Sequence, residues 1–315
     1  MIIMEKEKNK KKKKYIKPTD FVYLGAMVLM LLLVFGYKAR QEMLSRLYPG
    51  DEVTFGTYLD EPIVWRVLKV ERNRAVLVSD QILTMKAFDA AESGAYALDD
   101  TGGKWLIDDK RTLENLEMQE YTHGTNDWSR SDIRTWLNSN HVNVVYEGNG
   151  PAGKAMAEEK NGYLFEAGFL SGFSDKEQEA IVLTHNVTRG NAMSDCDVET
   201  DDLVYLPSLD ELEWFYDANV NVFAVPTDSA IERDETNSYQ IYSVDWGLEP
   251  YVWWLRDPVE GYSSKVHAVN NGYGDKLLIE RIAGIGGNGV RPVVTVDVKK
   301  FTELKKTPIV QLSEN

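Results

Sequence analysis

Two hydrophobic patterns divide the chain. Residues 21–37 are apolar or aromatic and carry no charge, whereas the residues after about 50 alternate between short apolar runs and polar turns. The first pattern predicts one transmembrane helix over residues 21–37, because about 17 to 25 apolar residues cross the hydrocarbon core of a bilayer. The second pattern predicts a globular domain over residues 50–300 that is rich in short strands.

Apolar runs near both ends of this domain predict β-strands, because they are rich in β-branched and aromatic residues. The second and third runs flank the polar turn Glu71–Arg74, which predicts a β-hairpin. Gly and Asn turns between such runs are typical of an antiparallel sheet. The predicted strands are 53–59, 63–70, 75–79, 251–256, 265–269, 275–281 and 292–298.

Three helix starts are marked by a serine followed three residues later by an acid. The serine can cap free backbone N–H groups and the acid can reach back to the serine N–H. Glu favours this return contact more than Asp does, so the first pair is the weakest signal. The pairs are Ser129 with Asp132, Ser174 with Glu177, and Ser208 with Glu211.

The remaining parts of the domain are polar. Residues 90–126 are predicted as a loop, and the Gly-rich stretch 147–172 as an inserted surface loop or subdomain. Few helices, many loops and an order that does not alternate strand with helix predict the α+β class. Residues 301–315 are predicted as a C-terminal tail.

Charge gives the predicted helix a direction. Residues 1–17 carry eight lysines and two glutamates, a net of about +6. We therefore expect residues 1–20 to be a cytoplasmic basic tail, 38–49 a stalk, and the domain to lie outside the plasma membrane. A cleaved signal peptide is the alternative, but the apolar run exceeds the usual 7–15 residues and no small-residue cleavage site follows.

The outer domain is strongly acidic. The 315 residues carry a formal net charge of −15, so the part after the basic tail carries −15 − 6 = −21. This excess repels nucleic acid and anionic lipid headgroups, and neutral sugars, cationic peptides or metal ions are easier partners. Cys196 is the only cysteine, which excludes a disulfide within the chain and a Cys-ligated zinc site. An exported domain without disulfides fits a bacterial cell surface.

Seven motifs along residues 51–298 carry a family resemblance. They are Ile63–Leu68, Ile82–Thr84 with Phe88-Asp89, Trp128–Asn138, Thr200–Glu211, Pro226-Thr227, Trp253–Arg256 and Gly289–Pro292. In this order they resemble a domain of unknown function common on surface proteins and lipoproteins of Gram-positive gut bacteria. That family is similar to the C-type-lectin-like fold of formylglycine-generating enzymes. The resemblance implies a twisted antiparallel sheet with two or three helices and long loops, but no established activity. Asp257, where the family has Ser, and the long 147–172 stretch depart from its pattern.

No catalytic residue is assigned from the sequence. Enzymes related to this fold bind copper through two cysteines, which Cys196 alone cannot supply. The Gly-rich run 284–289 leads into a strand rather than a helix, which indicates a tight turn and not a phosphate-binding loop. The histidines form no recognisable catalytic pattern. They are His123, His141, His185 and His267.

A weak metal site is considered in the acidic run. Carboxylates at alternate positions supply the hard oxygen ligands that calcium prefers. The alternative is a solvated acidic loop, and the lack of an EF-hand-like glycine pattern favours it. The candidate ligands are Asp195, Asp197, Glu199 and Asp201.

Candidate ligand-binding residues gather in the C-terminal third. Aromatic faces stack on sugar rings, arginine forks to carboxylates or hydroxyls, and amides interleaved with aromatics suit carbohydrate or peptide recognition. Adjacent tryptophans on a strand point to opposite faces, so we expect one in the core and the other exposed. A core role for most of the cluster is the main alternative, and Arg291 is expected to pair with a buried acid. The candidates are Trp253, Trp254, Arg256, Tyr262, His267, Asn270 and Tyr273.

The sequence therefore predicts a membrane-anchored extracellular module that binds a glycan or a surface protein. The competing hypothesis is a carboxylate-dependent surface hydrolase acting on glycans or amides, whose mechanism would depend on the separation of two carboxylates. A third hypothesis is a structural domain of an envelope complex.

Overall fold

The computed structural model divides the chain into two compact units, Met1–Arg46 and Leu47–Asn315. The structure describes residues 23, 25–36, 46–91, 112–147, 150–151, 163, 166–194, 196–232, 234, 239, 250–272 and 276–306.

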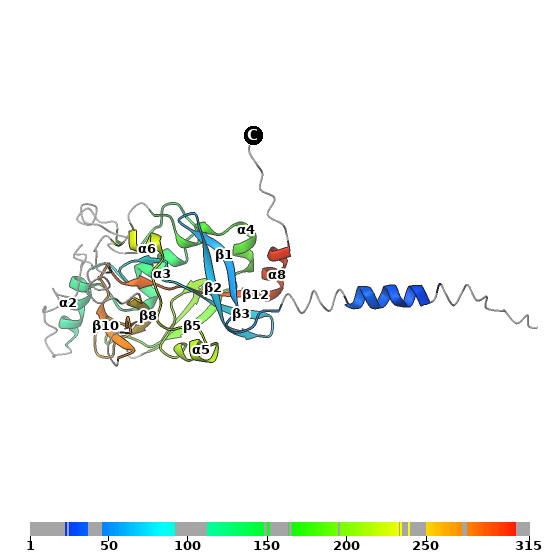
Figure 1. Cartoon of the computed structure of the whole chain (residues 1–315). Helices are drawn as coiled ribbons and strands as arrows, with labels where there is room; N and C mark the ends of the chain where they lie inside the picture. The colour runs from blue at the N-terminus through cyan, green and yellow to red at the C-terminus, as the bar shows by residue number, and fades with distance from the viewer. Residues whose placement is uncertain are drawn as a thin grey trace, which may run out of the picture. The chain divides into compact units, whose positions relative to one another are not determined.

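The first unit contains one helix over the described residues 25–36, drawn in blue in Figure 1. Its residues are all exposed. Within the part of the chain that the structure describes, no helix has both the length and the apolar character needed to cross a membrane. The tail 1–20 and both ends of the predicted 21–37 segment lie outside the described residues, so the transmembrane assignment stays a prediction.

The second unit begins with a five-stranded antiparallel sheet. Its strand order is β1-β2-β3-β12-β7. The strands are β1 (Glu52–Tyr58), β2 (Glu61–Glu71), β3 (Arg74–Ser79), β7 (Val204–Tyr205) and β12 (Val293–Asp297). The predicted hairpin is confirmed, since β2 and β3 pair with Glu71 opposite Arg74.

Two tight turns of this sheet contain residues with left-handed backbone. Leu59 and Asp60 connect β1 to β2 with φ values of 51° and 65°, as expected for a two-residue hairpin turn. Arg72 connects β2 to β3 with a φ of 55°. This conformation costs a non-glycine residue roughly 1–2 kcal/mol.

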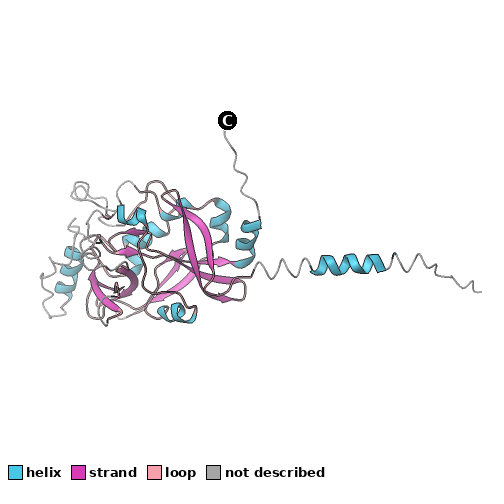
Figure 2. Cartoon of the chain, in the orientation of Figure 1, coloured by secondary structure: helices cyan, strands magenta, loops and turns pink. Residues whose placement is uncertain are grey.

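A second five-stranded sheet has the order β10-β9-β8-β11-β4. Its strands are antiparallel except for the parallel pair β8 and β11. They are β4 (Thr84–Met85), β8 (Trp253–Pro258), β9 (Lys265–Val269), β10 (Leu278–Ile282) and β11 (Gly289–Val290). The single sheet predicted from the sequence is thus two sheets, as Figure 2 shows. A separate hairpin of β5 (Thr184–Thr188) and β6 (Val198–Asp202) was not predicted, because its residues are mostly polar.

The helices are short and few, which confirms the α+β class (Figure 2). Residues 90–126, predicted as a loop, include a helix, and another helix begins within the last predicted strand. The helices and 3-10 turns of the second unit include α2 (Leu113–His123), η2 (Trp128–Arg130), α3 (Asp132–Leu137), η3 (Phe169–Gly172), α4 (Asp175–Ala180), α5 (Leu212–Asp217), α6 (Asp228–Glu232) and α8 (Val298–Lys306).

One of the three predicted helix caps is confirmed, because Ser174 and Glu177 form a capping box before α4. The reciprocal bonds predicted for the pair at Ser208 are present: the Ser208 N–H donates to Glu211 Oε2 at 2.9 Å and the Glu211 N–H donates to Ser208 Oγ at 3.2 Å. They close the turn before α5 and do not cap the helix, because α5 begins at Leu212 with Glu211 as its N-cap.

The third cap prediction, at Ser129, is wrong by two residues. Ser131 precedes α3, and its Oγ accepts from the Arg134 N–H at 3.4 Å. Ser129 lies instead in η2, where its N–H donates to Asp127 Oδ1 at 2.9 Å. The 3-10 turn delays the start of the α-helix, because Asp127 caps the turn first.

One hydrophobic core runs through the second unit and includes five fully buried tryptophans. Each indole N–H has an acceptor, which removes the main cost of burying this side chain. The donors and acceptors are Trp65 to Phe55 O (2.7 Å), Trp128 to Asp202 Oδ2 (3.0 Å), Trp136 to Ala167 O (3.0 Å), Trp253 to Val222 O (3.1 Å) and Trp254 to Lys86 O (2.8 Å).

Candidate functional site

The two candidate tryptophans of β8 both lie in the core. Trp253 and Trp254 each have 0% exposure. They point to opposite faces of the strand as expected, but both faces are covered: Trp253 stacks on Phe215, with ring centroids 6.0 Å apart, and Trp254 contacts Phe88 at 5.8 Å. Neither indole therefore offers a free face to a ligand. Both tryptophans are core residues, which was the alternative interpretation of the sequence, and the expectation that one of them is exposed is wrong.

Arg256 is also buried, and its guanidinium is used within the protein. It donates to both carboxylate oxygens of Glu211, at 2.6 and 2.9 Å, and to Leu206 O at 2.8 Å. Burial opposes its charge, but the attraction of Glu211 outweighs burial and raises the pKa of Arg256. The pair holds Glu211 rigidly at the start of α5.

The expected pairing of Arg291 with a buried acid is wrong, because none of the described carboxylates forms an ion pair with it. Its guanidinium donates to four backbone carbonyl oxygens, of Ser79, Asp80, Asn221 and Val222. Burial lowers the pKa of Arg291 to about 9, so the group is still charged at neutral pH. It joins the loop after β3 to the segment after α5 and is part of the scaffold.

The candidates Tyr262 and His267 meet at one hollow, called here the β9 groove, of about 660 Å³. Lys265 Nζ lies 4.2 Å from the centre of the Tyr262 ring and 3.2 Å from Glu280 Oε2. The β9 groove is lined by Leu116, Arg189, Gly190, Asn191, Ala192, Leu209, Pro258, Val259, Glu260, Gly261, Tyr262, His267 and Glu280. Asn270 does not line it and donates to Lys276 O at 3.1 Å. Tyr273 lies outside the described residues.

His267 is half-buried in this groove, opposite Glu280 in the β9–β10 register. Its Nδ1 is buried and makes no hydrogen bond within the described structure. Burial lowers the pKa of His267, with Glu280 opposing the shift. The imidazole is therefore neutral at neutral pH and offers a hydrogen-bonding atom rather than a charge.

The acidic run does not gather into a ligand cage where it is described. Glu199 and Asp201 are exposed on β6 and face His185, whose Nδ1 is 3.1 Å from Asp201 Oδ1 and whose Nε2 is 3.9 Å from Glu199 Oε2. Asp197 is exposed, and Asp195 lies outside the described residues. Searching the described residues gives no group of three His, Cys, Asp or Glu side chains placed to hold a metal ion.

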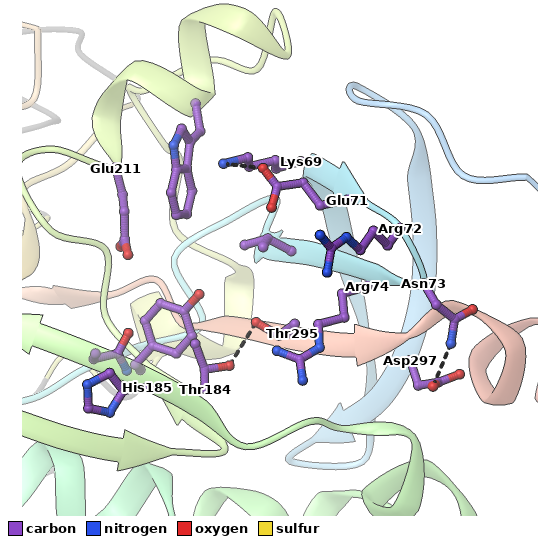
Figure 3. Close-up of a pocket in the computed structure, with 14 residues that line it drawn as sticks. Lys69, Glu71, Arg72, Asn73, Arg74, Thr184, His185, Glu211, Thr295 and Asp297 are labelled. Carbon is purple, nitrogen blue, oxygen red and sulfur yellow. Dashed lines mark hydrogen bonds and ion pairs between the residues drawn. The ribbon is translucent and has the colours of Figure 1, made fainter.

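A larger hollow, called here the hairpin groove, has a volume of about 920 Å³ and is shown in Figure 3. It lies within the roughly 300–1,000 Å³ range of small-ligand sites. The β2–β3 hairpin, β5, β7, α5 and β12 all contribute to it. Its lining residues are Lys69, Glu71, Arg72, Asn73, Arg74, Val76, Thr184, His185, Asn186, Tyr205, Glu211, Trp214, Thr295 and Asp297.

The floor of the hairpin groove is held by internal contacts. Thr184 Oγ1 donates to Thr295 Oγ1 at 2.8 Å, a bond drawn in Figure 3. Burial, followed by the nearby Glu211 charge, raises the pKa of the Tyr205 phenol, so it remains neutral. Glu211 is fixed by Arg256. A ligand entering the groove would therefore meet a surface that is already ordered.

The rim of the hairpin groove is made by an indole and charged side chains. Trp214 of α5 is half-buried, and Lys69 Nζ lies 4.9 Å from its ring centre. Lys69 also bonds Glu71 at 2.8 Å and lowers the pKa of that carboxyl. Arg72 and Arg74 are exposed and form no ion pair with any residue that the structure describes.

The third carboxylate of the groove, Asp297, is tied to the protein as well. The backbone N–H of Lys300 is the main cause that lowers its pKa, and Asn73 Nδ2 donates to its Oδ2 at 2.7 Å. Glu71 and Asp297 thus remain ionised at neutral pH. The sequence did not indicate this groove, because its lining residues lie far apart in the chain, from Lys69 to Asp297. The one local signal was the alternation of Arg72 and Arg74 in the predicted turn.

Comparison with known families gives one match. The family described as Domain of unknown function (DUF6273) matches residues 102–298, more than half of the 315 residues, and the chain belongs to this family. The match confirms the expected membership of an uncharacterised domain family. No curated protein and no solved structure matches the chain.

Proposed function

We propose that this member of the DUF6273 family is a membrane-anchored extracellular module that binds a glycan in the hairpin groove. The observation that carries the proposal is the composition of that groove. A half-buried indole stands beside an ordered floor of hydroxyl, amide and charged side chains. Aromatic rings stack on the apolar faces of sugars, while such polar groups bond sugar hydroxyls.

The state of the groove carboxylates favours binding over hydrolysis. A glycosidase needs one carboxylic acid with a raised pKa to protonate the leaving oxygen. Contacts with Lys69 and with the Lys300 N–H instead lower the pKa of Glu71 and Asp297. Glu211 is held by two bonds from Arg256. These acids suit fixed hydrogen-bond acceptors better than proton donors.

The anchor and the location of the domain are inferred from the sequence. The uncharged run 21–37 follows a lysine-rich segment, which supports an N-terminus in the cytoplasm and a domain outside the plasma membrane. The anchor is tested by washing membranes with alkaline carbonate. The full-length protein should stay in the pellet, whereas a chain lacking residues 1–45 should not. Release of the full-length protein would reject the anchor.

A C-type-lectin-like arrangement is part of the same proposal. Two mainly antiparallel sheets, short helices and long connections between them are compatible with that fold. An experimental structure superposed on C-type-lectin-like domains tests this part, and a different strand order would reject it.

Glycan binding is tested by co-sedimentation. Full-length protein in neutral detergent is mixed with purified Gram-positive cell walls and with insoluble polysaccharides, with calcium and with chelator. We expect saturable pelleting on at least one polymer, which Trp214→Ala reduces about tenfold or more, since stacking of this kind is worth about 1–3 kcal/mol. Tyr216→Ala is the matched control, because Tyr216 is 63% exposed on the same helix and does not line the groove.

Three results would count against this assignment. Absence of pelleting on every polymer would reject glycan binding. Unchanged pelleting by folded Trp214→Ala protein would reject the hairpin groove as the site. If Tyr262→Ala abolished pelleting instead, the glycan would belong in the β9 groove, where Tyr262 and His267 were predicted to act.

A further inference from the structure

The charges at the hairpin groove are unequally satisfied. Each lining carboxylate has a partner within the protein: Glu71 has Lys69, Glu211 has Arg256, and Asp297 has Asn73 and backbone N–H groups. His185, on the opposite side, faces two acids of β6. The two arginines of the hairpin form no ion pair with a described residue. The charge of Arg72 contributes to the lowered pKa of Glu71, and Arg74 lies opposite Glu71 and Asp297 in the strand register, but neither guanidinium is bonded to these acids.

Both arginines line the groove, and Figure 3 shows them on the hairpin beside Glu71 and Thr295. Arg72 lies in the turn and Arg74 opens β3. Guanidinium groups bind carboxylates and phosphates through paired N–H donors, and an unpaired one is available to a ligand.

The backbone of Arg72 has the geometry of a tight hairpin turn. Its φ of 55° lies in the left-handed region, as do those of Leu59 and Asp60 in the β1–β2 turn, and glycine would fit there more easily. What distinguishes Arg72 from these residues is that it lines the hairpin groove.

We infer that the hairpin groove selects an anionic glycan, whose acidic group is bound by Arg72 and Arg74 while a sugar ring lies against Trp214. The inference rests on the proposed function and deepens it by naming the class of polymer. The acidic group is a carboxylate or a phosphodiester, because both match the guanidinium fork. Because Trp214 lines the same groove as the two arginines, a sugar polymer is favoured over an acidic protein.

The acidic surroundings do not prevent this contact. The part of the chain after the basic tail carries −15 − 6 = −21, which opposes the approach of an anion. At physiological ionic strength, however, charges further away than about 8 Å are largely screened. Glu71 and Asp297 lie opposite Arg74 in the strand register and are too near to be screened, but Lys69 and the N–H groups of Lys299 and Lys300 already engage them. The two arginines act at direct contact, where the attraction of an acidic group is strongest.

The test compares polymers that differ in charge alone. Full-length protein in neutral detergent is titrated with polygalacturonate and with its carboxyl-reduced counterpart, which is neutral and has the same linkage. A glycerol phosphate polymer distinguishes phosphate from carboxylate, and polyglutamate represents an acidic protein. We expect one of the acidic polymers to bind about tenfold or more tightly than the reduced polysaccharide and than polyglutamate.

Variants assign the preference to the arginines. Arg72→Ala and Arg74→Ala should each weaken binding of the acidic polymer about fivefold, and the double variant should lose the preference. Arg189→Ala, an exposed arginine of the β9 groove, is the matched control and should change nothing. Arg72→Gly should weaken acidic binding to the same extent without lowering the melting temperature, because glycine accepts the left-handed turn.

The outcomes separate this inference from the proposed function. Equal binding of the charged and reduced polymers, with dependence on Trp214, would overturn the anionic preference and keep the glycan site. Persistence of the preference in the double variant would also overturn it, as would binding of polyglutamate with equal affinity. Failure of every polymer to bind would reject the proposed function itself.

Discussion

The buried pair of Arg256 and Glu211 allows a direct test of the scaffold beneath the hairpin groove. The side chain of Arg256 is 4% exposed and that of Glu211 is 11% exposed, and two N–H groups meet two carboxylate oxygens. Arg256→Met removes the cation but keeps much of the buried volume. It leaves the Glu211 carboxylate without its counter-ion.

The expected loss is large. Removing one member of a buried ion pair costs about 3–5 kcal/mol, because the remaining charge is neither solvated nor paired. For a domain of this size, about 2–4 °C of melting temperature corresponds to each kcal/mol, so the midpoint should fall by about 6–20 °C. Unfolding of the full-length protein in neutral detergent, followed by tryptophan fluorescence, measures the loss. Arg189→Met is the exposed control and should stay within about 0.5 kcal/mol.

A double variant identifies the cause of the loss. Arg256→Met with Glu211→Gln should recover part of the loss, because no buried charge remains. A loss below about 1 kcal/mol, or two single losses that simply add, would refute a coupled buried pair.

Three further predictions concern stability. Burial raises the pKa of Asp257, although the Leu209 N–H and Arg256 oppose the shift. Asp257→Asn should therefore raise the free energy of unfolding at pH 8, and this gain should shrink as pH falls through the raised pKa of Asp257. Burial lowers the pKa of His267, so wild-type stability should decline as pH falls below about 6.5, and His267→Gln should flatten that decline in a urea titration. Ser208→Ala leaves the buried Glu211 N–H without its acceptor and should cost about 1–3 kcal/mol; an unchanged unfolding midpoint would contradict a stabilising role of this bond.

The parts of the fold that follow local rules could be predicted from the sequence. The β2–β3 hairpin, the cap at Ser174 and the reciprocal bonds between Ser208 and Glu211 depend on residues close together in the chain, and these predictions are confirmed. The β5–β6 hairpin could not be predicted from hydrophobic alternation. Its outward positions are polar, and inward Asp202 is buried only because Trp128, Asn186 and Arg134 bond it.

The candidate binding residues could be predicted from the sequence even less well than the fold. Trp253, Trp254 and Arg256 carry the most suggestive chemistry in the sequence, yet all three are buried. Whether such a residue faces a ligand depends on what covers the second face of its strand, and Phe215 and Phe88, which are distant in the sequence, cover the faces of β8. Tyr262 and His267 do line a groove: His267 lies on β9, next to the edge strand β10, and Tyr262 lies in the loop before β9.

The four arginines discussed above differ in how many hydrogen-bond acceptors the protein itself provides for each guanidinium. Arg256 and Arg291 lie in the interior, where every N–H group must find an acceptor, and both have several acceptors within the protein. Arg72 and Arg74 lie at an open groove whose carboxylates are already engaged by other groups. Water satisfies them when the groove is empty, and a ligand acid can replace that water at little cost. A sequence motif that contains arginine therefore indicates binding only after the acceptors around each guanidinium are known, and by that criterion the hairpin turn, rather than the WWLR motif, is the place to look for a ligand.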